Sequence, residues 1–256
     1  MKSSEVTMRA LTGIKLVEPG DDLGAIAVGA FAANGLSARA DDVLVVAQKV
    51  VSKAEGRYVD VATVEPSQRA IALAADLDKD PRFVEVVLGE SKRVVRHRPG
   101  LLIVEHRLGF VMANAGIDHS NIPTADGVER VLLLPQDPDL SARRLRDHLA
   151  RVFSVAVGVV ISDSFGRPWR KGTVGIALGA AGLPSVIDLR GQPDLFGREL
   201  LVTETGFADE IAAAAGLLMG QADEAVPMVL VRGLSWSAPE LPVAAMVRSP
   251  EHDLFR

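Results

Sequence analysis

Short hydrophobic runs and helical segments follow one another along this chain without regular alternation. Three runs rich in β-branched residues, Asp42–Ala47, Val155–Ile161 and Val226–Val231, are bounded by polar residues and have the length of buried strands. Regularly repeated strand–helix–strand units, which are typical of a parallel sheet, do not occur. The sequence therefore predicts an α+β fold, or mixed α/β fold.

Helix and hairpin signals complete the expected set of elements. Pro66 and Ser67 precede one helical stretch, as residues that begin helices often do. Two apolar stretches around Leu108 and Gly109 are typical of a β-hairpin. The expected helices are Gln68–Leu77, a helix that begins at Pro81, Ser141–Phe153 with Ser141 as its N-cap, and Phe207–Met219, and the expected hairpin strands are Leu101–Val104 and Phe110–Met112.

Charge and composition narrow the function classes. The 256 residues carry a net charge of -5, so the chain lacks the basic field that non-specific nucleic-acid binding needs. It contains no cysteine, which excludes disulfides and thiolate metal sites. Met1–Ala10 lacks the apolar core of a signal peptide, and the longest apolar run is too short to span a bilayer. We expect a cytoplasmic protein without nucleic-acid or membrane partners.

Several familiar catalytic and nucleotide-binding motifs are absent. The glycines at Gly172, Gly175, Gly179 and Gly182 form neither a P-loop nor a dinucleotide-binding fingerprint. The five histidines lack the H-E-x-x-H spacing of zinc hydrolases, and there is no G-x-S-x-G elbow of a serine hydrolase. The expected fold is therefore neither a P-loop fold nor a Rossmann fold.

Two polar segments, Asn114–Asn121 and Ser162–Arg167, each follow a predicted strand and are expected to be loops. The first contains Asp118, and the second contains Asp163 beside Ser164. Carboxylate and hydroxyl oxygens are the ligands that hard divalent cations prefer. The same residue types also form ordinary turns, so the pattern alone leaves a metal site and a plain turn both open.

Basic and aromatic residues stand near these segments. Lys53 follows the first predicted strand and has the length to reach a phosphate, although most lysines are simply solvated. Arg167, Arg170 and Lys171 form a basic cluster in a segment expected to be a loop, where they either contact an acidic substrate or form an exposed face. Trp169 lies within this cluster, and stacking on a ring and packing in the core both remain open for it.

Several separated blocks carry a more specific signal. They are Val45–Arg57, Asn114–Asn121, Ile161–Arg167, Asp194–Leu200 and Ala208–Ala212, with Pro19–Leu23 near the start and Leu217–Gly220 near the end. In this order, from about Gly13 to about Leu234, the blocks resemble the coenzyme F420-0:L-glutamate ligase family, also called the F420 gamma-glutamyl ligase family.

The resemblance implies an activity, its co-substrates and a fold. GTP would phosphorylate the terminal carboxylate of the deazaflavin coenzyme F420-0, and the amino group of L-glutamate would attack the acyl phosphate, with release of GDP and phosphate. Mg²⁺ or Mn²⁺ would be required and K⁺ would assist. Residues 1–256 would form one ligase unit of two lobes with a fold specific to the family, without a C-terminal flavin domain, and the protein would be a homodimer.

The resemblance also implies site residues. Asp118, Asp163, Ser164 and Gln221 match metal positions, and Asp118 and Asp163 together with Lys53 would be the catalytic set. Gln221 stands where relatives carry a carboxylate, and Gln48 stands where some carry a small hydroxyl residue. The implied nucleotide contacts are Ile14, Lys15, Leu16, Val17, Gln48, Lys53, Asn121, Met219, Gly220, Gln221, Ala222, Asp223, Glu224, Ala225 and Val226.

Three alternatives to this ligase remain open at the level of the sequence. A metal-dependent nucleotide phosphohydrolase would use the same aspartates and release phosphate from GTP without glutamate. A non-catalytic GTP- or deazaflavin-binding relative would bind without turnover, but it would not need Asp118, Asp163 and Lys53. A ligase of the same family fold that acts on a different acid acceptor is the third.

Overall fold

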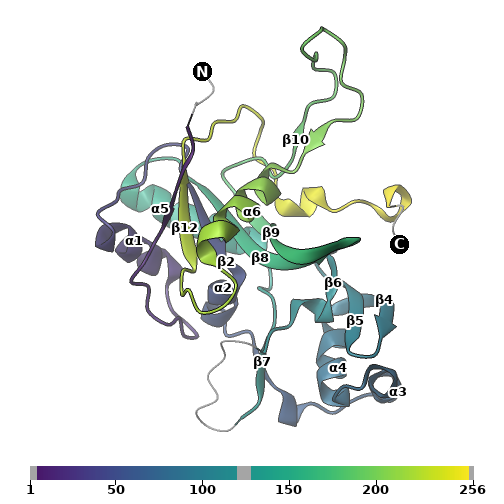
Figure 1. Ribbon diagram of the computed structural model, residues 1–256. Coiled ribbons are helices and arrows are strands. Elements are labelled where there is room, and N and C mark those ends of the chain that lie inside the picture. The colour runs from purple at the N-terminus through teal and green to yellow at the C-terminus, as the bar shows by residue number, and fades with distance from the viewer. Residues whose placement is uncertain (1–4, 120–127, 254–256) are drawn as a thin grey trace. The chain divides into compact units, whose positions relative to one another are not determined.

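The computed structural model describes residues 5–119 and 128–253, and it divides the chain into two compact units (Figure 1). Both units combine helices with sheets, so the expected α+β class is confirmed. The first unit comprises Met1–Val17, Asp21–Val51 and Asp137–Met246, and the second comprises Glu18–Gly20, Ser52–Gln136 and Val247–Arg256. Within the described residues, no helix has the length and apolar character needed to cross a membrane.

A five-stranded sheet in the order β1-β12-β2-β8-β9 forms the centre of the first unit. Only β2 and β8 are parallel neighbours, and every other adjacent pair is antiparallel. This order differs from a doubly wound parallel sheet, in agreement with the missing dinucleotide-binding motif. The strands are β1 (Thr7–Ala10), β12 (Met228–Arg232), β2 (Val43–Ala47), β8 (Gly158–Arg167) and β9 (Arg170–Ala181).

Helices cover both faces of this sheet. Leu44 and Val46 of β2 share one buried cluster with Phe31 and Leu145, which come from α1 (Leu23–Ala33) and α5 (Pro138–Phe153). Because side chains alternate along a strand, the intervening Val45 faces the other side of the sheet. The helix α6 (Phe207–Met219) packs against β8, β9 and β12 and lies in front of the sheet in Figure 1.

The glycine-rich segment is a strand whose glycines allow helices to approach closely. A Cβ atom on Gly179 would lie 2.3 Å from the backbone of Pro138 at the start of α5, and one on Gly175 would lie 2.5 Å from the carbonyl oxygen of Ala212 in α6. The expectation of a loop at Ser162–Arg167 is wrong, because these residues continue β8 and pair with β9 in a long hairpin. The loop expected around Arg170 is wrong for the same reason.

Local signals placed most other elements correctly, with shifts at several of their ends. The N-cap of α5 is Asp137, whose carboxylate accepts the backbone N–H of Leu140 at 2.9 Å, so the predicted N-cap at Ser141 is wrong. The strand β8 begins at Gly158, where its ladder with β2 starts, and not at Val155 as predicted. The strand β12 begins after Pro227, because proline has no N–H to donate to a ladder.

The second unit contains two small sheets and two helices around a separate core. The predicted hairpin is confirmed. The core of the unit includes Leu102 and Val104 from the hairpin and Leu77 and Phe83 from the helices. The elements are β3 (Tyr58–Asp60), α3 (Gln68–Leu77), α4 (Pro81–Gly89), β4 (Ser91–Arg98), β5 (Leu101–His106), β6 (Val111–Ala113) and β7 (Arg130–Leu132). Short 3₁₀ helices lie at Val61–Thr63, Asn114–Gly116 and Pro250–His252, and a fourth, Val243–Met246, belongs to the first unit.

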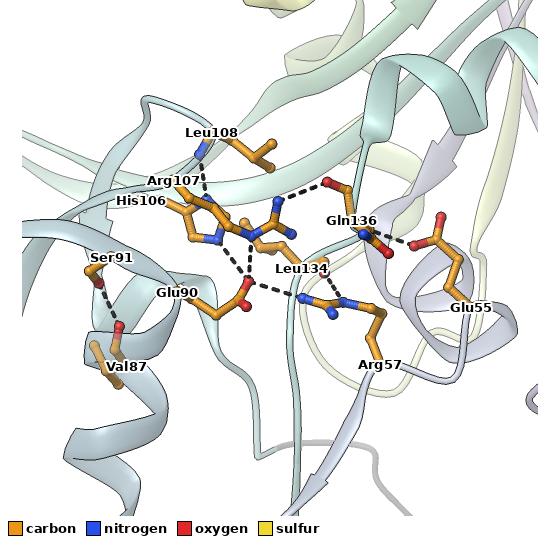
Figure 2. A network of polar contacts seen from close by, with 10 residues as sticks. All are labelled: Glu55, Arg57, Val87, Glu90, Ser91, His106, Arg107, Leu108, Leu134 and Gln136. Atoms are coloured by element: carbon orange, nitrogen blue, oxygen red, sulfur yellow. Dashed lines mark hydrogen bonds and ion pairs between the residues drawn. The ribbon is translucent and has the colours of Figure 1, made fainter. Parts of the chain in front are cut away.

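A charged network lies where the chain enters and leaves the second unit (Figure 2). One carboxylate oxygen of Glu90 accepts from Nη2 of Arg57 at 3.0 Å and from Nε of Arg107 at 3.0 Å. Arg57 also donates to the carbonyl oxygen of Leu134, and Arg107 donates to that of Gln136. The network therefore ties the entering and leaving segments to the corner between α4 and β4.

Glu90 keeps its charge in this partly buried place. His106 is fully buried, and its Nδ1 accepts the N–H of Leu108 at 3.0 Å, which leaves the ring proton on Nε2, 3.5 Å from the Glu90 carboxylate. Burial opposes the charged form of Glu90, but the hydrogen bonds from His106 and Arg107 and the positive charges of Arg107 and Arg57 outweigh it. They lower the pKa of Glu90 from 4.5 to about 2.

Candidate functional site

One edge of the five-stranded sheet collects segments that are far apart in the sequence. The strands β1, β2 and β8 run in the same direction and β12 runs the opposite way, so the ends of the first three meet the start of the fourth. Ala47 pairs with Ser162 across β2 and β8, and its N–H donates to the carbonyl oxygen of Pro227 at 2.8 Å. The ends of parallel strands at such an edge are a common place for a ligand site.

The polar half of β8 meets the end of α6 at this edge. The Ser164 hydroxyl donates to the side-chain oxygen of Gln221 at 2.7 Å, and the Ser162 hydroxyl lies 3.7 Å from the sulfur of Met219. Alternation along the strand turns Ser162 and Ser164 toward this helix end and turns Asp163 toward the opposite face of the hairpin. The structure thus brings Ser164 and Gln221 together and separates Asp163 from both.

The donor set at this place suits a hard divalent cation. Ser164 and Gln221 supply neutral oxygens within 2.7 Å of each other, whereas the partly buried Asp163, at the adjacent position of the same strand, is directed to the other face. Oxygen donors of this kind leave most of the coordination to phosphate and water, as Mg²⁺ usually requires. No group of three or more His, Asp or Glu side chains that would hold a metal by itself is found in the described ranges 5–119 and 128–253.

The loop after α6 surrounds a carboxylate of its own. The helix ends at Gly220, whose φ of 70° and ψ of -170° suit glycine, and a Cβ there would collide with the Glu224 carboxylate. This carboxylate accepts the N–H of Ala222 at 2.8 Å. Hydrogen bonds from the backbone N–H groups of Ala222, Glu224 itself and Gln221 lower the pKa of the Glu224 carboxyl. The loop therefore presents several backbone donors to a single anion.

The remaining sequence-predicted nucleotide residues of the first unit lie at the same edge. The segment 14–17 follows β1, whose successor Leu11 donates its N–H to the carbonyl oxygen of Met228. Within it Ile14 packs on the core, Lys15 bonds Asp21 at 2.7 Å, Leu16 is exposed and Val17 is buried. Gln48 is buried at the start of α2 (Gln48–Ala54), directly after β2. Lys53 lies in the last turn of α2 and belongs to the second unit.

The other predicted metal ligand belongs to the second unit. Asp118 follows a tight turn in which Asn114, Ala115 and Gly116 all have positive φ, and it forms a two-way backbone bridge with Leu132. This bridge fixes its backbone against the strand β7. Asn121 lies outside the described residues. The assignments of Asp118, Asn121 and Lys53, like those of the other predicted metal and nucleotide residues, stay predictions.

Asp209 is a positioning residue that the sequence reasoning did not single out. It stands in the first turn of α6, and its carboxylate accepts the N–H of Ala177 in β9 at 2.8 Å. Burial raises the pKa of its carboxyl, so the side chain is held in a poorly solvated place. By joining α6 to β9, it helps to set the position of the helix end that carries Met219 and Gln221. The signals in the sequence were an Asp at the start of an Ala-rich helix and its place in the block Ala208–Ala212.

Comparison with known families decides the relationship. A model of the F420-0:gamma-glutamyl ligase family matches residues 13–233, a range that includes every segment at the sheet edge except β1. The chain belongs to this family. Curated relatives of this family member also match nearly the full length of the chain. Those described next are each named coenzyme F420:L-glutamate ligase.

The relatives come from several archaea. The protein of Methanopyrus kandleri is 47% identical over 94% of this chain and 93% of its own, and that of Methanothermobacter thermautotrophicus is 41% identical over 98% and 99%. The protein of Natronomonas pharaonis is 44% identical over 89% of this chain and 85% of its own. The resemblance of the sequence blocks to the F420 gamma-glutamyl ligase family is thereby confirmed.

Proposed function

We propose that this protein is a coenzyme F420:L-glutamate ligase that forms an amide between a carboxylate of the coenzyme and the amino group of L-glutamate. The observation that carries the proposal is the match to ligases of that name over 94% and 98% of the chain. The convergence of four chain segments at one sheet edge supports it, because a ligase must hold several substrates in line.

GTP is proposed as the activating co-substrate. A free carboxylate is a poor electrophile, so its oxygen first takes the terminal phosphoryl group of GTP and GDP leaves. The amino nitrogen of glutamate then attacks the carbonyl carbon of the acyl phosphate, the bond to phosphate breaks, and the nitrogen loses a proton. The loop Met219–Val226 supports a phosphate site, because its backbone N–H groups already converge on an anion.

From the resemblance to the ligase family we propose that Asp163, Ser164, Gln221 and Asp118 bind divalent metal and that Lys53 contacts a phosphate. Mg²⁺ or Mn²⁺ held by these residues would neutralise phosphate charge, and K⁺ is proposed as an auxiliary ion. The hydrogen bond between Ser164 and Gln221 holds the two neutral donors close together. Asp163 would contribute negative charge from the part of β8 that pairs with β9, one residue beyond the ladder with β2.

The acyl-phosphate step has a direct chemical test. Hydroxylamine added in place of glutamate, with the glutamate-free coenzyme, GTP and Mn²⁺, is expected to trap the activated carboxylate as a hydroxamate visible by mass spectrometry. The hydroxamate should be absent when GTP is omitted. Glutamyl transfer without any trapped hydroxamate would contradict a released or accessible acyl phosphate.

Removing the carboxylate of Glu224 is expected to lower the KM for GTP. In Glu224→Ala the backbone donors of the loop are vacated and one negative charge near the phosphates disappears, so we expect a two- to fivefold decrease, a scale of roughly one exposed charge pair. Steady-state kinetics at varied GTP measures it.

Asp223→Ala is the matched control for Glu224→Ala, because it removes the same charge from the same loop, and within the described residues the Asp223 side chain accepts no hydrogen bond from the loop's backbone donors. A similar KM for GTP in both variants would show that the change results from the lost charge alone. An increased KM in Glu224→Ala would show instead that the carboxylate takes part in GTP binding.

A homodimer is proposed from the arm between β10 (Ile187–Asp188) and β11 (Glu204–Thr205), which extends away from the rest of its unit in Figure 1. Four large apolar side chains on this arm, Leu195, Phe196, Leu201 and Val202, are between 74% and 98% exposed. A cluster of this kind is typical of a protein interface.

Sedimentation equilibrium is expected to give twice the chain mass of 27.1 kDa for the wild type. Phe196→Ser should shift the equilibrium toward the monomer, because the apolar side chain leaves the interface. Leu217→Ser, which changes an equally exposed leucine on α6, should leave it unchanged. A wild-type monomer at micromolar concentration would contradict the proposal.

A further inference from the structure

The tip of the β8–β9 hairpin presents an aromatic ring among cations. Both strands are exposed from Gly166 to Thr173, and the side chain of Trp169 at the turn is 84% exposed. The alternative that Trp169 packs in the core is therefore wrong. Trp169 also has a φ of 60°, a left-handed conformation that costs a bulky residue about 1 kcal/mol. Neither core packing nor turn geometry accounts for tryptophan at this position.

The charge at the tip is of one sign. Arg167, Arg170 and Lys171 are all exposed, and in the described part of the chain their side chains make no ion pair or side-chain hydrogen bond. Residues 164–181 include no Asp or Glu, although the whole chain carries a net charge of -5. The tip is thus a local concentration of positive charge that attracts an anionic ligand.

The tip is physically continuous with the candidate site. Arg167 lies four residues beyond Asp163 on the same strand, a separation of roughly 13 Å at 3.3 Å per residue. A ligand that places its reactive carboxylate near Asp163 and extends along the hairpin would bring its other end to Trp169. The deazaflavin coenzyme has this form, with a flat ring at one end and an acidic chain that ends in the carboxylate.

We propose that the hairpin tip from Arg167 to Lys171 is the binding site for the coenzyme substrate, with Trp169 stacked on the deazaflavin ring and Arg167, Arg170 and Lys171 paired with its acidic chain. The inference rests on the proposed ligase function. It assigns the recognition of the acceptor to residues separate from the proposed metal ligands and from the loop Met219–Val226.

The kinetic test separates coenzyme binding from the chemical step. Trp169→Leu keeps an apolar side chain but removes the ring, and it is expected to raise the KM for the coenzyme about tenfold, the scale of an aromatic stacking contact. The KM for GTP and the kcat should stay within about twofold. Trp169→Phe retains a ring and should recover most of the loss.

The charge contribution is tested with Arg170→Gln combined with Lys171→Gln. The KM for the coenzyme should rise severalfold at low ionic strength and differ less from the wild type at high salt, because salt screens exposed charges. Arg144→Gln is the matched control and should have no effect, because within the described residues this exposed arginine on α5 makes no ion pair or side-chain hydrogen bond. Melting temperatures should match the wild type in all variants.

Direct binding keeps the inference testable apart from catalysis. Titration calorimetry of the glutamate-free coenzyme against wild type and Trp169→Leu should show weaker binding in the variant, whether or not the wild type transfers glutamate. If the wild type transfers no glutamate but still binds the coenzyme more tightly than Trp169→Leu does, only the proposed function is refuted. Equal affinity and equal KM for the coenzyme in both proteins would refute the proposed binding site at the tip. A change of oligomeric mass in Trp169→Leu would also refute it, because the tip would then be a contact between two copies of the chain.

Discussion

Replacing Asp163 by asparagine is expected to lower the kcat for glutamyl transfer by about 100-fold or more while the fold stays intact. Asparagine has nearly the same shape, and the backbone at this position is held by the pairing of β8 with β9. The variant loses one negative charge at the proposed metal site, and electrostatic groups that act on phosphoryl transfer commonly contribute this much to the rate. Single-turnover kinetics and circular dichroism together measure both parts of the expectation.

A control variant and a metal titration make the Asp163 result specific. Asp147→Asn removes the same charge from an exposed position on α5, where the carboxylate contacts only a neighbouring arginine, Arg146, and it should leave kcat unchanged. The Mn²⁺ concentration for half-maximal activity should rise in Asp163→Asn. Full activity of Asp163→Asn at the wild-type Mn²⁺ requirement would exclude this residue as a metal ligand.

Replacing Glu90 by glutamine is expected to destabilise the second unit by about 3 kcal/mol. The variant leaves the positive charges of Arg57 and Arg107 without their shared carboxylate in a partly buried place, and removal of one partner from such a pair has a cost of this order. Because these residues also hold the carbonyl groups of Leu134 and Gln136, the loss should extend to the segment that leaves the unit. A decrease of roughly 6–12 °C in Tm is expected.

The pH dependence follows from the lowered pKa of Glu90, which is about 2 against an ordinary value of 4.5. The unfolded chain binds a proton more tightly than the folded chain, so unfolding takes up a proton between these two values. The stabilisation is therefore complete above about pH 4.5 and is lost as the pH falls toward 2. Denaturant unfolding at pH 7 and pH 3 should show a smaller difference between wild type and Glu90→Gln at pH 3.

Glu65→Gln is the control for this series, because it changes a glutamate of the same unit that lies outside the network. Its stability should stay within about 0.5 kcal/mol of the wild type at both pH values, as is usual for a surface substitution. An equally small effect of Glu90→Gln would show that solvent reaches the two arginines and compensates for the missing charge.

Elements with local signals were predictable from the sequence. The helix α3 has the predicted bounds because Ser67 caps it through a hydrogen bond to the N–H of Ala70, and α6 ends where Gly220 supplies a positive φ. Both signals act within a few residues, so no knowledge of the remaining fold was needed.

Elements that depend on distant partners were not predictable. The polar half of β8 is a strand because it pairs with β9, and β9 is rich in glycine because α5 and α6 cross it at Gly179 and Gly175. The helix α1 was missed as well, although Asp22 caps it. These features result from packing across the sheet, which a single sequence does not display.

The candidate site was predictable in its residue types but not in its arrangement. Asp163, Ser164 and Gln221 were named from the resemblance, and the structure adds that Ser164 and Gln221 are in contact whereas strand alternation directs Asp163 to the other face. The internal anion contact of Glu224 was invisible in the sequence, because it depends on the backbone conformation at Gly220.

The most direct test of the account is mass spectrometry of the products from purified protein, glutamate-free coenzyme, L-glutamate, GTP and Mn²⁺. We expect a coenzyme product heavier by one or more glutamyl units, formed together with GDP and absent when GTP or metal is omitted. Release of GDP and phosphate without a glutamyl product would contradict the ligase and point to a nucleotide phosphohydrolase or to a different acceptor. Bound GTP without any turnover would identify a binding protein instead.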